Sequence, residues 1–224
     1  IYTADVLWSL GIRNVRIVGC PTVFRRNDPG LRIDLPKLED VREAGFPLRR
    51  EVSHDYAQDV PHYLNLQRDT IGELSRRFDL SVMAQGEVEE KAILWGTPEQ
   101  AEAARNKLRH ETWLRGEGDR MEEHYRSKLW YSDVVAEWEA FVRSKDLILG
   151  YRLHGNLMAL ANRTPSVYFT YDSRTAEFAE TFQIPSFDVF GKERFVLEDY
   201  WDQARFEKFN RAYSQRYREM RMFL

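Results

Sequence analysis

The hydrophobic residues of this chain follow two alternating periods along most of its length. Short apolar runs typical of strands are followed by stretches in which apolar residues recur every three or four positions, as in helices. Val60, Leu64, Ile71, Leu74 and Phe78, for example, share one face of a helix. The pattern predicts strands at residues 46–52, 80–84, 129–131, 147–149 and 166–171. It predicts helices at residues 60–78, in a short stretch ending at Trp95, and at residues 134–142, 155–161 and 174–182.

Strands that alternate with helices in this way are joined by right-handed crossovers and form a parallel sheet. The predicted fold class is therefore α/β, a Rossmann-like parallel sheet flanked by helices. Residues 99–126 are dense in charges of both signs, and we interpret them as a solvated helix and a loop. Ligands of such folds bind outside the carboxyl ends of the strands.

The sequence at the two ends of the chain predicts elements outside the alternating strands and helices. A short helix is expected at residues 4–10, then a strand at residues 15–18, and residues 25–37 look like an irregular linker. We therefore expect residues 1–35 to be the end of an N-terminal Rossmann-like domain with a hinge, and residues 36–197 to be a second such domain. Residues 198–224 are expected to form one long helix that packs back towards the N-terminal part. The aromatic and apolar face of that helix comprises Phe206, Phe209, Tyr213, Tyr217, Met220 and Leu224.

Composition excludes several classes of protein. The 33 basic and 36 acidic residues give a net charge of -3, which argues against a dedicated nucleic-acid binder. The single cysteine, Cys20, excludes an internal disulfide and favours a reducing, cytoplasmic location; we interpret it as structural. No apolar run is long enough to span a bilayer. Ile1 opens directly into helix-like sequence, so we expect an N-terminal domain to precede it.

The strongest chemical signal lies directly after the strand at residues 147–149. Arg152 and His154 stand two residues apart there, and Gly155 opens the next helix. A helix N-terminus offers free N–H groups to an anion, and an imidazole with a pKa of about 6.5 suits proton transfer near neutrality. The pair could hold a phosphate or carboxylate and move a proton, although a histidine with a purely structural hydrogen bond remains an alternative.

Other polar residues follow the neighbouring strands. Arg49 and Arg50 could bind an anion in the same crevice, or form ion pairs with Glu51 or Asp55. Tyr171, Asp172 and Arg174 follow the strand at residues 166–171, where Asp172 or Ser173 is also suited to capping the next helix. Gln85 and Glu87 occupy the matching position after residues 80–84. The chain contains neither a glycine-rich dinucleotide or phosphate loop nor a His/Cys/Asp cluster with metal-ligand spacing.

An ordered set of segments resembles the polysaccharide pyruvyl transferase family. It consists of Leu10-Gly-Ile-Arg-Asn-Val-Arg-Ile-Val-Gly-Cys-Pro, Leu48-Arg-Arg-Glu-Val-Ser, Glu137-Trp with Ser144-Lys-Asp-Leu-Ile-Leu-Gly, Gly150-Tyr-Arg-Leu-His-Gly-Asn-Leu-Met-Ala-Leu, Thr164-Pro-Ser-Val-Tyr, Tyr171-Asp-Ser-Arg with Phe178, and Ile184-Pro. The likeness covers most of residues 10–190. It implies the C-terminal domain of a GT-B-like two-domain architecture. Arg174 departs from the pattern, since many relatives have lysine there.

The resemblance implies an enzyme that moves a pyruvyl group from phosphoenolpyruvate onto two hydroxyls of a glycan sugar, giving a ketal. The acceptor would be a glycan or lipid-linked saccharide; no metal or redox cofactor is implied, and oligomeric state is left open. Arg152 and Arg49 would clamp the anions, and His154 would act as general acid or base. The expected catalytic residues are His154 and Arg152, and the expected substrate-binding residues are Arg49, Arg50, Leu153, Gly155, Asn156, Tyr171, Asp172, Arg174 and Gln85.

Two other functions stay open at the level of the sequence. One is a GT-B glycosyltransferase that uses a nucleotide sugar, with Glu177 or Glu180 on the ribose. The other is a non-catalytic Rossmann-like fragment that binds a partner through its aromatic C-terminal helix.

Overall fold

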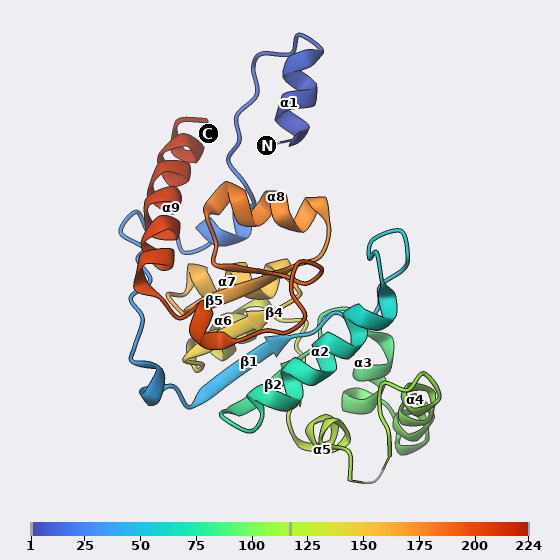
Figure 1. Cartoon of the computed structure of the whole chain (residues 1–224). Coiled ribbons are helices and arrows are strands. Elements are labelled where there is room, and N and C mark those ends of the chain that lie inside the picture. Colours follow the sequence, from blue (N-terminus) through green and yellow to red (C-terminus); the bar gives the residue numbers. More distant parts are fainter. Residues whose placement is uncertain (1, 117, 224) are drawn as a thin grey trace.

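A six-stranded parallel sheet forms the centre of the molecule in a computed structural model, which describes residues 2–116 and 118–223 (Figure 1). The strand order is β3-β2-β1-β4-β5-β6. The strands are β1 (Glu43–Pro47), β2 (Asp79–Met83), β3 (Leu129–Trp130), β4 (Leu147–Gly150), β5 (Ser166–Thr170) and β6 (Ser186–Asp188). The predicted α/β class with a parallel, helix-flanked sheet is confirmed.

The order reverses between β1 and β4, which pair in parallel with Ala44 opposite Leu147. The chain runs outward from β1 through β2 to β3 on one side, and from β4 to β6 on the other. Loops from β1 and β4 therefore separate at their carboxyl ends, the usual location of a ligand crevice in open α/β sheets.

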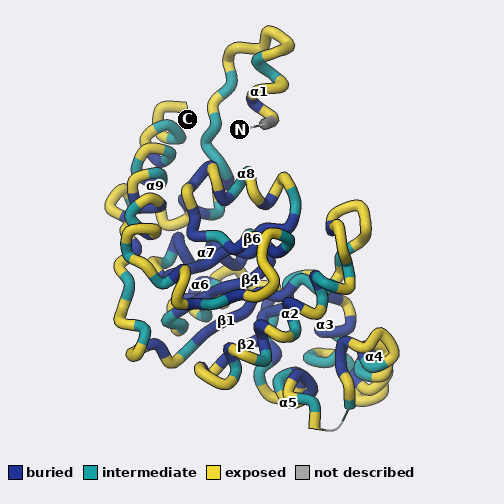
Figure 2. Tube along the Cα trace, in the orientation of Figure 1, coloured by how far each residue is buried: buried dark blue, intermediate teal, exposed yellow. Residues whose placement is uncertain are grey.

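Helices cover both faces of the sheet (Figure 1). On one face, α2 packs its residues Tyr63, Leu66 and Ile71 into a core that includes Phe46 of β1 and Phe169 of β5. On the other, α7 and α8 bury Leu157, Leu160 and Phe182. Figure 2 shows the buried strands between exposed outer helix surfaces. The helices that cover or flank the sheet are α2 (Val60–Leu74), α3 (Val88–Trp95), α4 (Pro98–His110), α5 (Arg120–Ser127), α6 (Val135–Arg143), α7 (Leu153–Ala161) and α8 (Ser173–Phe182).

The C-terminal helix α9 (Gln203–Phe223) begins later than predicted, after a 3-10 turn at Leu197–Asp199. Its predicted apolar face is buried at Phe206, Phe209, Tyr213 and Tyr217, and Met220 packs against the same core. Leu224 lies outside the described residues. The face packs beside the segment at residues 20–33, to which α9 is also hydrogen-bonded.

Three boundary predictions differ from the structure. The strand predicted at residues 15–18 is absent: after α1 (Tyr2–Ser9) and a turn at residues 10–11, the chain has no regular secondary structure as far as the 3-10 turn at Pro21–Phe24. Residues 15–18 show the apolar alternation of a strand, but among the described residues no strand pairs with them. The first strand of the sheet ends at Pro47, so that Arg49 and Arg50 lie in a loop, and the short strand β6 was not predicted.

Candidate anion-binding site

The turn after β4 is fixed to the end of β1 by two hydrogen bonds. The backbone N–H groups of Tyr151 and Arg152 both donate to the carbonyl oxygen of Pro47, at 3.0 and 3.2 Å. Gly150 has φ +150°, and a Cβ there would lie 2.9 Å from the same oxygen. This close approach requires glycine, and it places the side chain of Arg152 beside the β1 loop.

Gly155 supports the same close packing. A Cβ at this position would lie 2.9 Å from Cβ of Pro47 and 3.0 Å from Nε2 of Gln85. Its neighbour Leu153 packs against the core formed with α8 and α9. The structure therefore shows Leu153 and Gly155 in packing roles, and their predicted contacts with substrate stay predictions.

Asn156 has a different position from the one predicted for a substrate-binding residue. It is fully buried, and its Nδ2 donates to the carbonyl oxygens of Gly150 (3.1 Å) and Arg152 (2.7 Å). Its Oδ1 accepts a hydrogen bond from the Ser166 hydroxyl at 2.7 Å. With donor and acceptor both engaged inside the fold, Asn156 stabilises the turn, and its predicted contact with substrate stays a prediction.

Arg152 is held at two points. Its Nε donates to the carbonyl oxygen of Leu48 at 3.3 Å, and its Nη2 forms an ion pair with Glu87. The Arg152 side chain is 21% exposed and that of Glu87 is fully buried. The guanidinium is therefore oriented but still reaches the surface.

Arg49 extends from the β1 loop towards the β5 loop. Its backbone is fixed by Gln67, whose Oε1 accepts from the Arg49 N–H at 2.8 Å. Its guanidinium carbon lies 5.4 Å from the centre of the Tyr171 ring. The buried Nε of Arg49 has no hydrogen-bond partner in the described structure. A buried N–H group of a cation without an acceptor is suited to an anionic ligand.

Tyr171 and Asp172 directly precede α8, and Arg174 lies in its first turn. The Asp172 carboxylate accepts from the backbone N–H of Thr175 at 2.7 Å, which confirms the predicted helix cap. Arg174 is exposed, and the described chain contains no ion pair to it. Burial raises the pKa of the Tyr171 hydroxyl, while Arg49, Arg152 and Arg174 all act to lower it. Three guanidinium groups, from the β1 loop, the turn before α7 and the first turn of α8, are therefore close enough to act on one phenol.

His154 is exposed in the first turn of α7 and pairs with Cys20 from the N-terminal segment. The pKa of His154 is raised, mainly by the hydrogen bond with Cys20; partial burial and the charges of Arg174 and Arg152 oppose this. Burial raises the pKa of the Cys20 thiol, but hydrogen bonds with His154 and Thr22 outweigh it and the net pKa is lowered. The sequence interpretation of Cys20 as merely structural missed this contact, because 134 residues separate the partners.

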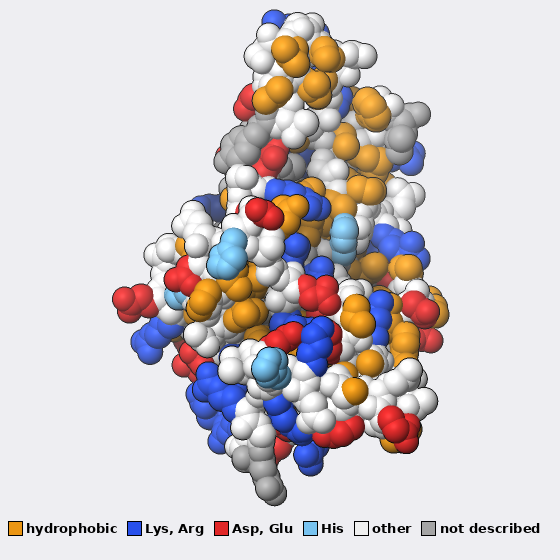
Figure 3. Space-filling model, turned by 90° about the vertical axis from the view of Figure 1, so that its right-hand side faces the viewer, with side chains coloured by type: hydrophobic (Ala, Val, Ile, Leu, Met, Phe, Trp, Pro, Cys, Tyr) orange, Lys and Arg blue, Asp and Glu red, His pale blue; other side chains and the backbone are white. Residues whose placement is uncertain are grey.

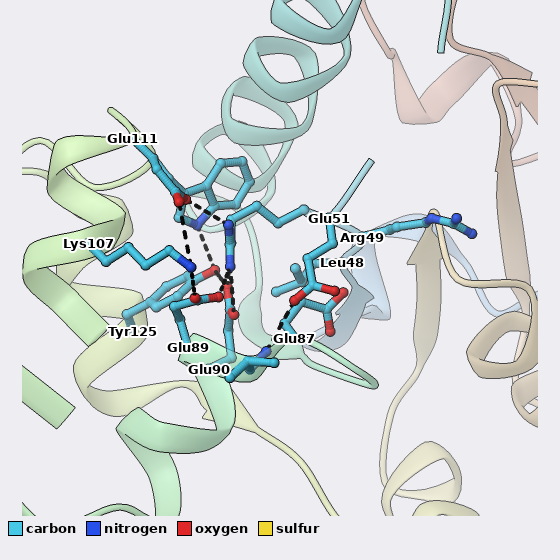
Figure 4. Close-up of polar contacts among 12 residues, drawn as sticks. Leu48, Arg49, Glu51, Glu87, Glu89, Glu90, Lys107, Glu111 and Tyr125 are labelled. Carbon is cyan, nitrogen blue, oxygen red and sulfur yellow. Dashed lines mark hydrogen bonds and ion pairs between the residues drawn. The ribbon is translucent and has the colours of Figure 1, made fainter. Parts of the chain in front are cut away.

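Arg50 lies outside this group of residues. Its side chain is 9% exposed and forms ion pairs with Glu89, Glu90 and Glu111. The ion-pair alternative for Arg50 is therefore found, but with these three carboxylates as partners in place of Glu51 and Asp55. Figure 4 shows Glu89, Glu90, Glu111 and Lys107 gathered together, with Arg49 directed away from them. Glu89 and Glu90 of α3 and Glu111 at the end of α4 therefore compensate the charge of the Arg50 guanidinium.

Gln85 stands at the carboxyl end of β2, and its amide lies against Gly155, as described above. The face that includes α3 and α4 has Lys/Arg and Asp/Glu side chains next to one another, without a large area of one sign (Figure 3). The described residues include no group of three or more His, Cys, Asp or Glu side chains that could hold a metal ion. Within the same residues, no helix is both long and apolar enough to cross a membrane.

The fold and the group of cations define an α/β protein with several arginine side chains at the edge of the sheet where its strand order reverses. A family model described as polysaccharide pyruvyl transferase matches residues 1–173 of the 224. The chain belongs to this family, which implies a transferase that modifies polysaccharides and a glycan acceptor. No curated protein and no solved structure matches the chain. The family match ends at the start of α8, so β6 and α9 lie beyond it.

Proposed function

We propose that this protein transfers a pyruvyl group from phosphoenolpyruvate to two hydroxyls of a glycan sugar, forming a ketal. The observation that supports this is the convergence of Arg49, Arg152 and Arg174 around Tyr171, with His154 on the adjoining turn. Phosphoenolpyruvate has a carboxylate and a phosphate, and guanidinium groups bind both in the bidentate manner. The Rossmann-like unit would be the donor-binding half of a GT-B-like architecture.

The chemistry assigns one proton transfer to His154. The protonated imidazole gives its proton to the methylene carbon of the enol, and the adjacent carbon becomes oxocarbenium-like. A sugar hydroxyl adds to that carbon and loses its proton, and phosphate departs with the electron pair of its C–O bond. A second hydroxyl adds and closes the ring. Of the two protons that the hydroxyls lose, one returns to the imidazole and the other leaves with the phosphate, so the products are the ketal and inorganic phosphate. No step changes an oxidation state, so the reaction requires no redox cofactor.

A raised pKa suits this role, because His154 then holds its proton at a higher pH. Arg49 and Arg152 bind the two anionic groups of the donor, and Arg174 adds positive charge at the rim. Gln85 and Tyr171 offer further donors beside them. Losing one arginine contact should weaken donor binding by about 1.5–3 kcal/mol, the usual range for hydrogen bonds to charged groups.

The test is calorimetric titration of the whole protein with phosphoenolpyruvate and, separately, with a panel of nucleotide sugars. We expect phosphoenolpyruvate to bind and the nucleotide sugars not to bind. Arg152→Ala should weaken the binding of phosphoenolpyruvate. His154→Ala should still bind it but should form ketal roughly 10²–10⁴-fold more slowly. Lys208→Ala, an exposed substitution on α9, is the matched control. Preferential binding of a nucleotide sugar, or full ketal formation by His154→Ala, would refute the proposal.

A further inference from the structure

One fully buried carboxylate lies directly behind the proposed donor site. Glu87 follows β2 and has no exposed surface. Its Oε2 accepts from the backbone N–H groups of Gln85 and Gly86, at 2.8 and 2.9 Å. Its Oε1 faces Nη2 of Arg152. A buried carboxylate is stable only when hydrogen bonds or a cation compensate its charge, and here both are present.

The loop that contains Glu87 also encloses the guanidinium of Arg152. A Cβ on Gly86 would lie 3.4 Å from Nη2 of Arg152. On the other side, Nε of Arg152 donates to the carbonyl oxygen of Leu48 at 3.3 Å. Among the described residues, Nη1 has no such contact. The planar group is therefore fixed by two of its three nitrogens, while the third is left for a ligand.

The neighbouring acids do not share this position. Glu89 and Glu90 bind Arg50, and Glu51 accepts from the backbone N–H of Val88 at 3.2 Å. Figure 4 shows Glu51 beside Glu87, and Glu89 and Glu90 in the separate cluster. Glu87 is the one carboxylate of the described chain in an ion pair with Arg152.

We propose that Glu87 is a positioning residue that fixes the guanidinium of Arg152 for the anionic donor, an inference that rests on the proposed function. Because Glu87 also balances the charge of Arg152, Arg152 contributes oriented N–H groups more than net charge. The net attraction for the donor then comes mainly from Arg49, Arg174 and protonated His154. The effect of Glu87 on the donor is therefore transmitted through Arg152.

The experiment is a double-mutant cycle on the whole protein, with Glu87→Gln, Arg152→Ala and the two combined. Phosphoenolpyruvate affinity, KM and kcat are measured for each. We expect Glu87→Gln to raise KM for phosphoenolpyruvate by about 10- to 100-fold, by analogy with partners that orient metal ligands. In the Arg152→Ala background the same substitution should change KM by less than about twofold, because contacting residues that act together are not additive.

Thermal unfolding provides a readout that does not depend on activity. Arg152→Ala leaves a buried carboxylate unpaired and should lower the melting temperature, and adding Glu87→Gln should restore part of the loss. Glu51→Gln is the matched control and should change neither KM nor the melting temperature appreciably. If Glu87→Gln does not fold, Glu87→Asp is the alternative variant. It keeps the negative charge but moves the carboxylate away from Arg152, so it should still raise KM for phosphoenolpyruvate.

The outcomes separate the two proposals. Arg152→Ala with unchanged donor affinity would overturn the proposed function and this inference with it. Weakened binding in Arg152→Ala together with unchanged binding in Glu87→Gln and Glu87→Asp would overturn the inference alone. An equal loss from Glu87→Gln with and without Arg152 would also overturn it, since that result indicates a general structural role.

Discussion

At the residue scale, the contact between Cys20 and His154 gives the proposed acid a definite pH dependence. The pKa of His154 is raised chiefly by its hydrogen bond with Cys20. If His154 acts as the proton donor, kcat/KM falls as the pH rises through this raised pKa. Cys20→Ala removes the hydrogen bond and should move the alkaline limb of the pH profile to lower pH. Cys20→Ser retains a hydrogen-bonding group and should move the limb less.

Proton NMR titration of the His154 ring in the same variants checks this prediction without turnover. The ring should titrate at a lower pH in Cys20→Ala than in the unaltered protein. A His154 pKa that is the same in all three proteins would contradict it. The charges of Arg152 and Arg174 also lower the pKa of His154, and because neither residue is changed, their contributions stay constant across the series.

Sequence reasoning named the cations of the candidate site, and Glu87 near them, but not the contacts that Glu87 and Cys20 make with these cations. Arg49, Arg152 and His154 were recognisable because each follows an apolar strand, and the carboxyl ends of parallel strands meet at one edge. Glu87 contacts Arg152, which is 65 residues away along the chain, and Cys20 contacts His154, which is 134 residues away. No local pattern in the sequence encodes such contacts. Arg50 was misplaced because its three carboxylate partners lie on α3 and just after α4.

At the scale of elements, the Arg50 network joins the β1 loop to α3, α4 and α5. Glu90 also accepts a hydrogen bond from the Tyr125 hydroxyl at 2.7 Å, and Lys107 pairs with Glu89. The sequence predicted the sheet and most of the helices from periodicity alone. It could not predict this network, because the charged stretch at residues 99–126 looks the same whether its side chains are solvated or paired.

Arg50→Ala should destabilise the protein by about 3–5 kcal/mol, since it leaves the buried Glu90 carboxylate without its cation. Urea unfolding measures the loss. Arg32→Ala is the control, because the Arg32 side chain is 53% exposed and its pair with Glu207 should contribute at most about 1 kcal/mol. Phosphoenolpyruvate affinity of folded Arg50→Ala should be unchanged. A selective loss of affinity with normal stability would instead return Arg50 to the donor site.

At the scale of the whole molecule, α9 attaches the N-terminal segment, residues 20–33, to the domain that contains the sheet. Asn210 of α9 accepts from the Ile33 N–H at 2.8 Å and donates to the Ile33 carbonyl oxygen at 3.1 Å. The Tyr213 hydroxyl donates to the Asp28 carbonyl oxygen at 2.8 Å. The same segment contains Cys20, so α9 contributes to holding the thiol beside His154. The sequence predicted the helix and its apolar face, but the partner of that face became evident only from the fold.

Asn210→Ala tests this attachment of the N-terminal segment to α9. Both lost hydrogen bonds are buried. The Ile33 N–H would be left unpaired, whereas the Ile33 carbonyl oxygen would keep the hydrogen bond from Nε2 of Gln203 at 3.2 Å, so we expect a loss of about 1–3 kcal/mol of stability. Hydrogen exchange should increase first in residues 31–35, while the strands of the sheet remain protected. Lys208→Ala, on the exposed side of the same helix, should alter neither quantity. Uniform loss of protection across the sheet would mean that α9 and the sheet unfold as one unit, and the N-terminal segment would then have no separate attachment.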